Sequence, residues 1–281
     1  MYKILEKTQF SEKVFKFRIE APAIAKHAHA GQFLMVRANE TGERVPFTFA
    51  DWNPEEGWVE FIFMVVGKTT KMLSTYEPGD AILDVTGPLG QPTVMGPGTT
   101  CVIGGGVGLA IAYPVARTLV KTGHEVHAIM GARTKDLLLL EDQFRELLPE
   151  DHIHITTDDG SYGEKGVVTA PLDKKIVDGA NFDEVITIGP LIMMKFVVKT
   201  TKPHNVKTVV SMNPIMVDGT GMCGGCRLTV GGQTKFACVD GPDFDGFEVD
   251  FDEAMHRGTM YKPFEAHARE AECNLLKQEV Q

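Results

Sequence analysis

The sequence predicts a small antiparallel β barrel, followed by an α/β domain with a parallel sheet and by a short cysteine-rich segment. Three observations predict this order. Short runs of alternating apolar and polar residues fill the chain up to about residue 98. From Thr99 onward, apolar strands alternate with helical stretches, which is typical of a parallel sheet with crossover helices. Three of the five cysteines then fall within 16 residues, among glycines.

Length and composition fit a globular protein of two domains, with 281 residues and 43% hydrophobic content. The net charge of −10 argues against nucleic acid as a partner. The longest candidate apolar run, from Ala128 to Leu140, contains three charged residues, so we expect no membrane span. The chain starts without the apolar stretch of a signal peptide, and an odd, clustered set of cysteines argues against disulfides. We therefore expect a cytoplasmic protein.

The first predicted domain covers residues 1–98 and is all-β. Phe15 to Glu20 alternates at period two, as a half-buried strand does, whereas 32–37 and 58–66 are more continuously apolar strand candidates. Turn residues lie at 53–57 and 77–80. Six or so short strands separated by turns fit a small antiparallel barrel.

Two stretches of this domain carry groups that bind phosphate or an aromatic cofactor. One is Arg44-Val-Pro46-Phe47-Thr48, and the other is Gly67-Lys-Thr69-Thr70. A guanidinium makes forked contacts to phosphate oxygens, which hydroxyls and glycine amides complete. A hydroxyl and an aromatic ring offer a flavin a hydrogen bond and an apolar face. Taken singly, each stretch is also compatible with an ordinary surface turn.

The second predicted domain covers residues 99–217. We expect a first strand over 101–103, a helix over 109–122, a second strand over 123–131 and a second helix over 137–148. Further strands are expected at 152–156, 185–188 and 207–212. Between the first strand and its helix lies Gly104-Gly105-Gly106-Val-Gly108. Such a turn allows close backbone approach, and the helix N-terminus attracts pyrophosphate. The alternative is a tight strand-to-helix turn without a ligand, because the run is not a strict G-x-G-x-x-G.

The third predicted segment covers residues 218–250 and has metal-ligand spacing. Cys223 and Cys226 are separated by two residues, Cys238 follows, and Asp218 stands where a C-x4-C-x2-C…C pattern has its first cysteine. That pattern belongs to plant-type [2Fe–2S] sites, and thiolates suit cluster iron. A carboxylate can replace one thiolate, which makes Asp218 the fourth candidate ligand. A zinc knuckle and a buried group of free cysteines are the alternatives.

The remaining residues, 251–281, form an acidic tail in this interpretation. From Val239 to the end there are eleven acidic and four basic residues, which gives a solvated face or a docking surface for a basic partner. We expect Cys101 in the core and Cys273 as a free thiol. The nine histidines show no pairing with a carboxylate at helical ligand spacing, so we assign none of them to a metal.

The order of these motifs resembles the ferredoxin–NADP reductase superfamily. With its terminal cysteine segment, the chain is similar to the electron-transfer subunit of class B dihydroorotate dehydrogenases and to sulfide dehydrogenase subunits. The run from Asn213 to Cys226, NPIMVDGTGMCGGC, is most similar to the small subunit of NADH-dependent reduced ferredoxin:NADP oxidoreductases, which are electron-bifurcating enzymes. Cysteine stands in the place of Asp218 in the dihydroorotate relatives, so this residue separates the two interpretations.

The resemblance implies three cofactor sites. FAD would be lined by Arg44, Pro46, Phe47 and Thr48, with Gly67, Thr69 and Thr70 at its pyrophosphate. NAD(H) would be lined by Gly104, Gly105, Gly106, Gly108, Arg133, Asp158, Gly189 and Pro190. A [2Fe–2S] cluster would be held by Asp218, Cys223, Cys226 and Cys238. Arg133 could pair with the 2′-phosphate of NADPH, although the resemblance implies NADH.

We therefore expect an oxidoreductase subunit that passes electrons between NAD(H), FAD and a [2Fe–2S] cluster. Its expected partner is a larger flavin and iron–sulfur subunit, and through that subunit ferredoxin and NADP(H). We assign no catalytic side chain, because the cofactors carry the chemistry. The alternatives are a dihydroorotate dehydrogenase or sulfide dehydrogenase subunit and, outside enzymes, a carrier with a cluster but no working flavin site.

Overall fold

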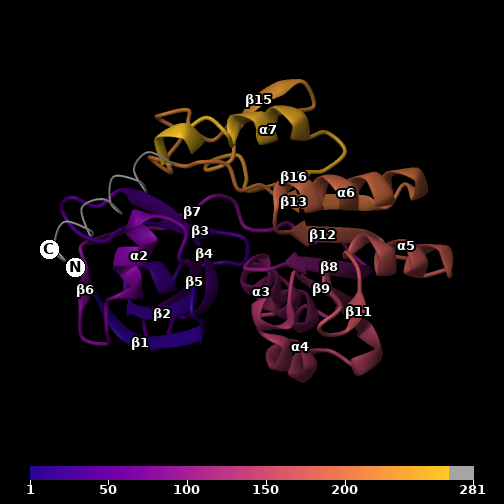
Figure 1. Ribbon diagram of the computed structural model, residues 1–281, viewed down its shortest axis with the longest axis horizontal. Coiled ribbons are helices and arrows are strands. Elements are labelled where there is room, and N and C mark those ends of the chain that lie inside the picture. The colour runs from indigo at the N-terminus through magenta and orange to yellow at the C-terminus, as the bar shows by residue number, and fades with distance from the viewer. Residues whose placement is uncertain (266–281) are drawn as a thin grey trace, which may run out of the picture.

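The computed structural model describes residues 1–265, which form three parts in chain order (Figure 1). The indigo and purple strands of the first part lie beside the parallel sheet of the second part. The third part, orange to yellow, lies along one side of both (Figure 1).

The first part is a curved, seven-stranded antiparallel sheet of the barrel type, with strand order β6-β1-β2-β5-β4-β3-β7. Its core is filled by phenylalanines, with the rings of Phe17 and Phe63 only 5.1 Å apart. The predicted period-two strand is confirmed, because Phe15, Phe17 and Ile19 are buried while the residues between them are half-buried. The strands are β1 (Tyr2–Ser11), β2 (Val14–Glu20), β3 (Phe33–Arg37), β4 (Arg44–Asn53), β5 (Trp58–Met64), β6 (Ala81–Ile82) and β7 (Asp84–Leu89).

Two short helices interrupt this part, for which the sequence predicts only strands. They are α1 (Pro22–Ala25) and α2 (Lys68–Ser74). Helix α2 begins after Gly67, where the Thr70 hydroxyl accepts the Gly67 N–H at 3.0 Å. Leu73 on this helix is fully buried in the barrel core. Local capping and one apolar anchor therefore favour a helix where the alternation of strands ends.

The second part is a sheet of order β11-β10-β9-β8-β12-β13-β16, in which all pairs are parallel except β13 with β16. Its first strand, β8, lies in the middle, and the chain builds outward first on one side and then on the other. The strands are β8 (Thr99–Gly105), β9 (Glu125–Ala132), β10 (Ile153–Thr157), β11 (Glu164–Lys165), β12 (Glu184–Ile188), β13 (Lys207–Ser211) and β16 (Asp243–Asp245).

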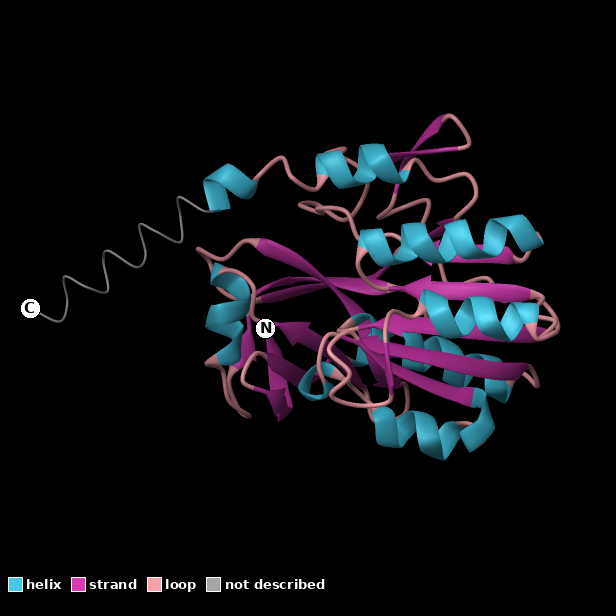
Figure 2. Ribbon diagram, turned by 45° about the vertical axis from the view of Figure 1, so that its right-hand side comes forward, coloured by secondary structure: helices cyan, strands magenta, loops and turns pink. Residues whose placement is uncertain are grey.

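Helices cover both faces of this sheet (Figure 2). Residues of α3 and α4 pack into one hydrophobic core, and residues of α5 and α6 contribute to cores on the other face. Helix α4 starts later than the predicted residue 137, because a 3-10 turn and a left-handed Leu140 (φ 60°) precede it. The helices are α3 (Gly108–Lys121), α4 (Glu141–Leu147), α5 (Thr169–Val177) and α6 (Leu191–Thr201), with 3-10 turns η1 (Lys135–Leu137), η2 (Glu150–His152) and η3 (Lys202–His204).

The third part holds the cysteines and ends in a helix. It contains the hairpin β14 (Arg227–Val230) and β15 (Gln233–Phe236), and then α7 (Phe251–Arg257). Helix α7 occupies the start of the predicted acidic tail, and its Phe251 and Ala254 are buried against the cysteine segment. Cys273 lies outside the described residues. Among residues 1–265, no helix is long and apolar enough to cross a membrane.

Candidate functional site

The glycine-rich turn lies at the carboxyl edge of the parallel sheet, between the end of β8 and the start of α3. The Gly106 N–H donates to the Gly131 carbonyl at 2.9 Å, which ties the turn to the end of β9. A Cβ at Gly108 would lie 2.3 Å from the Ile188 carbonyl oxygen of β12. Glycine therefore lets α3 begin directly against the neighbouring strand, which leaves the first N–H groups of the helix at the sheet edge.

The other predicted nucleotide residues lie at the same edge. Arg133 follows β9, Asp158 follows β10, and Gly189-Pro190 follows β12. The Asp158 N–H donates to the Ala132 carbonyl at 3.0 Å, so these loops are in register. Strand order reverses between β8 and β12, and ligands of open α/β sheets bind at such a point. The structure thus brings together residues that are 85 positions apart in the chain.

The predicted flavin strand is β4, which pairs with β3 along the barrel. Arg44, Pro46 and Thr48 alternate along it and share one face. Phe47 points to the other face, where its ring stacks on Phe61 at 4.9 Å with an interplanar angle of 3°. This placement favours a supporting role for the Phe47 ring within the barrel core. Its contact with a flavin stays a prediction.

The second flavin stretch forms the beginning of α2. Thr69 and Thr70 are buried, and the Thr70 hydroxyl accepts N–H groups of Val66 and Gly67 at 2.9 and 3.0 Å. That hydroxyl also donates to the Gly67 carbonyl. The Thr70 side chain therefore shapes the turn, and its predicted contact with the pyrophosphate remains untested.

The three clustered cysteines come together in one loop region. Cys226 and Cys238 are both 2% exposed, and their Sγ atoms lie 3.2 Å apart. Cys223 is exposed, and its Sγ accepts the Gly225 N–H at 3.4 Å. That N–H lowers the pKa of the Cys223 thiol, whereas burial and the Cys226 thiol raise the pKa of Cys238 to about 12. Iron coordination would remove the proton that the Cys238 sulfur otherwise keeps.

Asp218 lies beside this group. Its Oδ2 accepts three hydrogen bonds, from the Thr220 N–H at 2.9 Å, the Thr220 hydroxyl at 2.6 Å and the Met222 N–H at 3.2 Å. These bonds hold the pKa of the Asp218 carboxyl below its usual range. Oδ1 is then the oxygen that could bind a metal ion. Three thiols and one carboxylate fit the ligand number of a [2Fe–2S] cluster.

The cysteine loop packs directly on the barrel. A Cβ at Gly219 would lie 2.5 Å from Cγ of Met35 in β3, so only glycine permits this approach. Met35 and Phe33 of the barrel, Met194 and Val198 of α6, and Cys226 and Cys238 belong to one hydrophobic core. We call this group the junction core. It joins the flavin strand region, the nucleotide domain and the cysteine segment.

Sequence reasoning missed several contacts that link these parts. The Asn213 amide donates to the Gly189 carbonyl at 3.3 Å, which links the cysteine segment to the nucleotide edge. The positive charge of Arg44 contributes to the lowered pKa of Asp218, so the flavin strand and the metal loop are electrostatic neighbours. The Arg257 guanidinium of α7 donates to the Gly225 carbonyl at 3.3 Å. Asn213 begins the run that carries the family resemblance, whereas Arg257 carries no signal in the sequence.

Family models match the three parts in the same order. An oxidoreductase FAD-binding domain matches residues 1–93, and an oxidoreductase NAD-binding domain matches residues 102–199. The iron–sulfur cluster binding domain of dihydroorotate dehydrogenase B matches residues 213–250. The predicted cofactor set of FAD, NAD and an iron–sulfur cluster is thereby confirmed at the level of domains.

Relatives match nearly the whole chain. An electron transfer subunit homolog of dihydroorotate dehydrogenase B (NAD(+)) from Thermotoga maritima is 49% identical over 92% of this chain and 91% of its own. The corresponding electron transfer subunit of Streptococcus mutans is 31% identical over 89% and 97%. A solved structure of the NADH-dependent reduced ferredoxin-NADP oxidoreductase, described in terms of flavin-based electron bifurcation, is 47% identical with a TM-score of 0.89, over 96% and 97% of the two chains.

Proposed function

The chain belongs to the family of flavin and iron–sulfur electron-transfer subunits that these relatives represent, and on that premise we propose how it works. It is an oxidoreductase subunit with FAD-binding, NAD-binding and iron–sulfur domains. We infer that it passes electrons between NAD(H) and a larger flavin and iron–sulfur subunit, in NADH-dependent reduced ferredoxin:NADP oxidoreduction. A cytoplasmic location is part of this proposal.

The observation that carries the proposal is the junction core. The barrel, the nucleotide domain and the cysteine loop share one packed cluster of buried side chains, with the Gly219 backbone against Met35. Arg44 and Asp218 are electrostatic neighbours across this contact. A carrier protein that binds no flavin would not need its metal-binding loop to pack on β3, the strand next to β4.

The residues of the chain bind and orient the cofactors. The turn from Gly104 to Gly108 would receive the dinucleotide phosphates at the start of α3, and Gly189-Pro190 would border the nicotinamide half. The face of β4 with Arg44 and Thr48 would hold the flavin. When bound, FAD would supply hydride and single-electron transfer, and the cluster would supply single-electron transfer. Close packing at the junction core fixes the relative positions of these sites.

A partner subunit is supported by the exposed side of the cysteine loop. Met222 is 87% exposed and Val217 is 54% exposed, next to the accessible Cys223. Large apolar side chains around a cofactor site favour a surface that another protein covers. We propose that the larger subunit docks here and supplies the route to ferredoxin and NADP(H).

The test is a visible spectrum of the protein purified without oxygen, with FAD and iron analysis. We expect about one FAD and about two irons per chain, the content of one flavin and one [2Fe–2S] cluster. NADH should bleach the flavin bands. A protein with iron but no flavin, or with a flavin that NADH leaves oxidised, would contradict the proposal. Co-purification from the native source should recover the larger subunit.

A matched pair of variants tests the metal ligands. Cys226→Ala removes a thiol of the loop, and Cys101→Ala removes an equally buried thiol of β8. We expect the first variant to lose the cluster iron and the second to retain it. Equal iron content in the two variants would exclude Cys226 as a ligand.

The electron-transfer subunit of a class B dihydroorotate dehydrogenase is the second candidate function. It is favoured by the family model that matches residues 213–250. Asp218 in the place of a fourth cysteine favours the bifurcating enzyme instead. Co-purification with a dihydroorotate-oxidising flavoprotein, rather than with a subunit that uses NADP(H) and ferredoxin, would decide for this alternative.

A further inference from the structure

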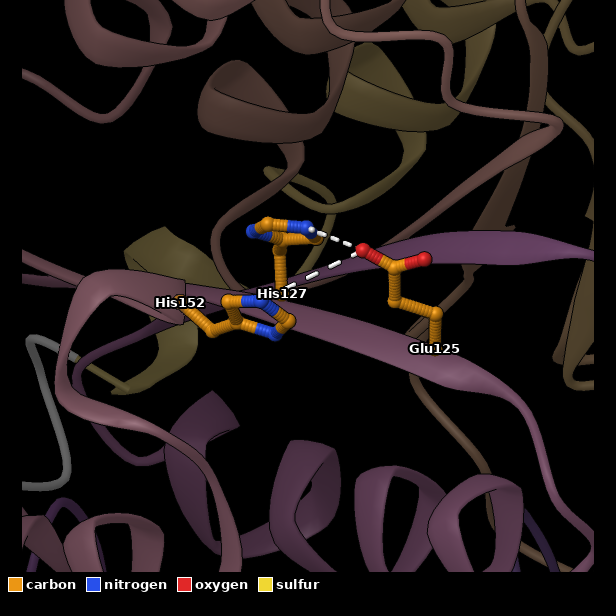
Figure 3. A group of neighbouring side chains, drawn as sticks. All are labelled: Glu125, His127 and His152. Carbon is orange, nitrogen blue, oxygen red and sulfur yellow. Dashed lines mark ion pairs between the residues drawn. The ribbon is translucent and has the colours of Figure 1, made fainter.

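Two histidines and a glutamate meet at the edge of the parallel sheet opposite to the nucleotide site (Figure 3). Glu125 and His127 alternate on β9 and therefore share one face of the sheet. His152 is the last residue of η2, directly before β10. Because Ile153 pairs with Ala128 in the parallel ladder, His152 lies beside His127. The sequence separates these two histidines by 25 positions, so no local spacing reveals the group.

The side chains are close enough to share one ion. A carboxylate oxygen of Glu125 and one nitrogen of each ring all lie within 4.8 Å of one another. Glu125 Oε1 is 3.5 Å from His127 Nε2 and 4.0 Å from His152 Nε2. Ligand atoms around a tetrahedral zinc lie roughly 3.3–3.5 Å apart, as its bond lengths of about 2.0–2.2 Å require. The Glu125 side chain is 58% exposed and can close the longer gap by a small rotation.

The hydrogen bond of His152 leaves one of its ring nitrogens free to face Glu125. His152 Nδ1 lies 2.9 Å from the Val126 carbonyl oxygen. Since a carbonyl only accepts, Nδ1 carries the proton, and in the neutral ring the lone pair of Nε2 then faces Glu125. This backbone contact is the kind that orients metal-binding histidines. His127 Nδ1 is buried and has no hydrogen-bond partner in the described residues.

Aromatic rings border the group. The rings of His127 and His152 stack with centroids 3.9 Å apart, and the Phe182 ring lies 5.3 Å from the His127 ring. The positive charge of Lys175 also acts on His127 and opposes any cation there, so the Glu125 carboxylate is needed to offset it. Imidazole nitrogens beside a carboxylate oxygen are a donor set that suits zinc-type ions.

We propose that Glu125, His127 and His152 form a binding site for one divalent transition metal ion of the zinc class. The three side chains supply two nitrogens and one oxygen, and water completes the coordination. His127 and His152 are 16% and 21% exposed, so the ion would be half-buried and reachable through the glutamate side. The site lies about 13 Å along β9 from Gly131 at the nucleotide edge. It is therefore separate from the three cofactor sites and would tie β9 to the segment entering β10.

The test is a calorimetric titration with ZnCl2 of the protein with its flavin and cluster in place, after dialysis to remove loosely bound metal. Wild-type protein should bind one zinc ion. His152→Gln and Glu125→Gln should bind zinc at least about 100-fold more weakly, a loss of affinity beyond that caused by losing an outer-sphere partner. His154→Gln is the matched control, because within residues 1–265 His154 pairs only with Glu164, at 2.9 Å. It should bind zinc as the wild type does.

Iron content is measured in each sample, so that zinc in an emptied cluster site is not counted. Zinc should also raise the melting temperature of the wild type and of His154→Gln, and leave that of His152→Gln and Glu125→Gln unchanged. Glu125 is exposed, so its variant is expected to fold. The proposal is overturned if wild type and both site variants bind zinc with the same stoichiometry and affinity, or if none binds it.

Discussion

Thiols of this chain occupy two different chemical environments. Cys101 is fully buried in β8, and burial raises the pKa of its thiol to about 12, which keeps it protonated and inert. Cys223 is exposed, and the Gly225 N–H lowers the pKa of its thiol. Burial does not by itself separate a core thiol from a candidate ligand, because Cys226 and Cys238 are also buried; their grouping with other thiols separates them from Cys101.

We expect Asp218 to influence the midpoint potential of the cluster more strongly than it influences whether the cluster is bound. We expect Asp218→Cys to retain the iron, because a thiolate is the usual fourth ligand, and to shift the midpoint potential. Redox-monitored EPR measures the shift. Asp240→Asn is the control, since Asp240 accepts the Phe236 N–H without belonging to the ligand set. An unchanged potential in Asp218→Cys would contradict the assigned role.

A buried carboxyl holds the end of the barrel domain against the last strand of the parallel sheet. The Thr93 hydroxyl donates to Asp243 Oδ2 at 2.6 Å, while Oδ1 is buried. Burial raises the pKa of the Asp243 carboxyl in the folded chain, against the hydrogen bond from Thr93, which lowers it. The folded chain therefore binds this proton more tightly than the unfolded chain does.

This difference predicts a pH dependence of stability. As pH rises from the unfolded pKa of about 4 through the higher folded pKa, Asp243 contributes a loss of stability. Asp243→Asn cannot ionise, so its free energy of unfolding should improve relative to the wild type over that pH range. Urea unfolding of both proteins at several pH values measures the difference. Parallel profiles would show that Asp243 keeps its ordinary pKa.

At the scale of elements, the turn between β8 and α3 decides how closely the helix approaches the sheet. Gly106 has φ 56°, and a Cβ added there would meet no heavy atom within 4 Å. At Gly108, by contrast, a Cβ would collide with the Ile188 carbonyl oxygen. Gly106 is needed for its backbone conformation, and Gly108 is needed for close packing. Both requirements favour glycine, for different physical reasons.

The two glycines should respond differently to alanine. Gly108→Ala forces α3 away from β12 and should cost about 1–3 kcal/mol of stability and weaken NADH binding. Gly106→Ala adds about 1–2 kcal/mol of backbone strain without a clash. Denaturation midpoints and NADH titrations compare them. NADH affinity in Gly108→Ala equal to that of the wild type would contradict the close-approach argument.

At the scale of the whole molecule, an ion pair joins the barrel to the nucleotide domain. Arg117 on α3 donates to Asp51 on β4 at 2.6 Å, with side-chain exposures of 20% and 29%. The guanidinium also lies over the Trp52 and Tyr113 rings, at 5.6 and 5.8 Å. This contact is a further attachment between the two domains, in addition to the junction core and the Thr93–Asp243 hydrogen bond.

A double-mutant cycle with Arg117→Met and Asp51→Asn measures this attachment. Because the pair is partly desolvated, we expect a coupling energy of about 1 kcal/mol. The exposed pair Lys195–Asp252, with exposures of 37% and 79%, is the control and should couple less. Equal coupling energies in the two cycles would show that the position of Arg117 between the domains does not strengthen its ion pair with Asp51.

The sequence alone determined the order of the three parts and most of their motifs, because hydrophobic periodicity, glycine turns and cysteine spacing are local signals. The turn at Gly104 to Gly108 and the Cys223–Cys238 segment both lie where those signals placed them. Helix α2 was missed, since its start depends on the Thr70 cap and on the burial of Leu73.

Only the tertiary structure decided which of these parts touch. Gly219 approaches Met35, strand pairing sets His152 beside His127, and Phe47 turns into the barrel core. Each of these depends on contacts between separate segments of the chain. Local residue spacing indicates which element or motif a segment can form, whereas strand order and packing determine which other segments it contacts. The junction core and the histidine–glutamate site are therefore properties of the fold.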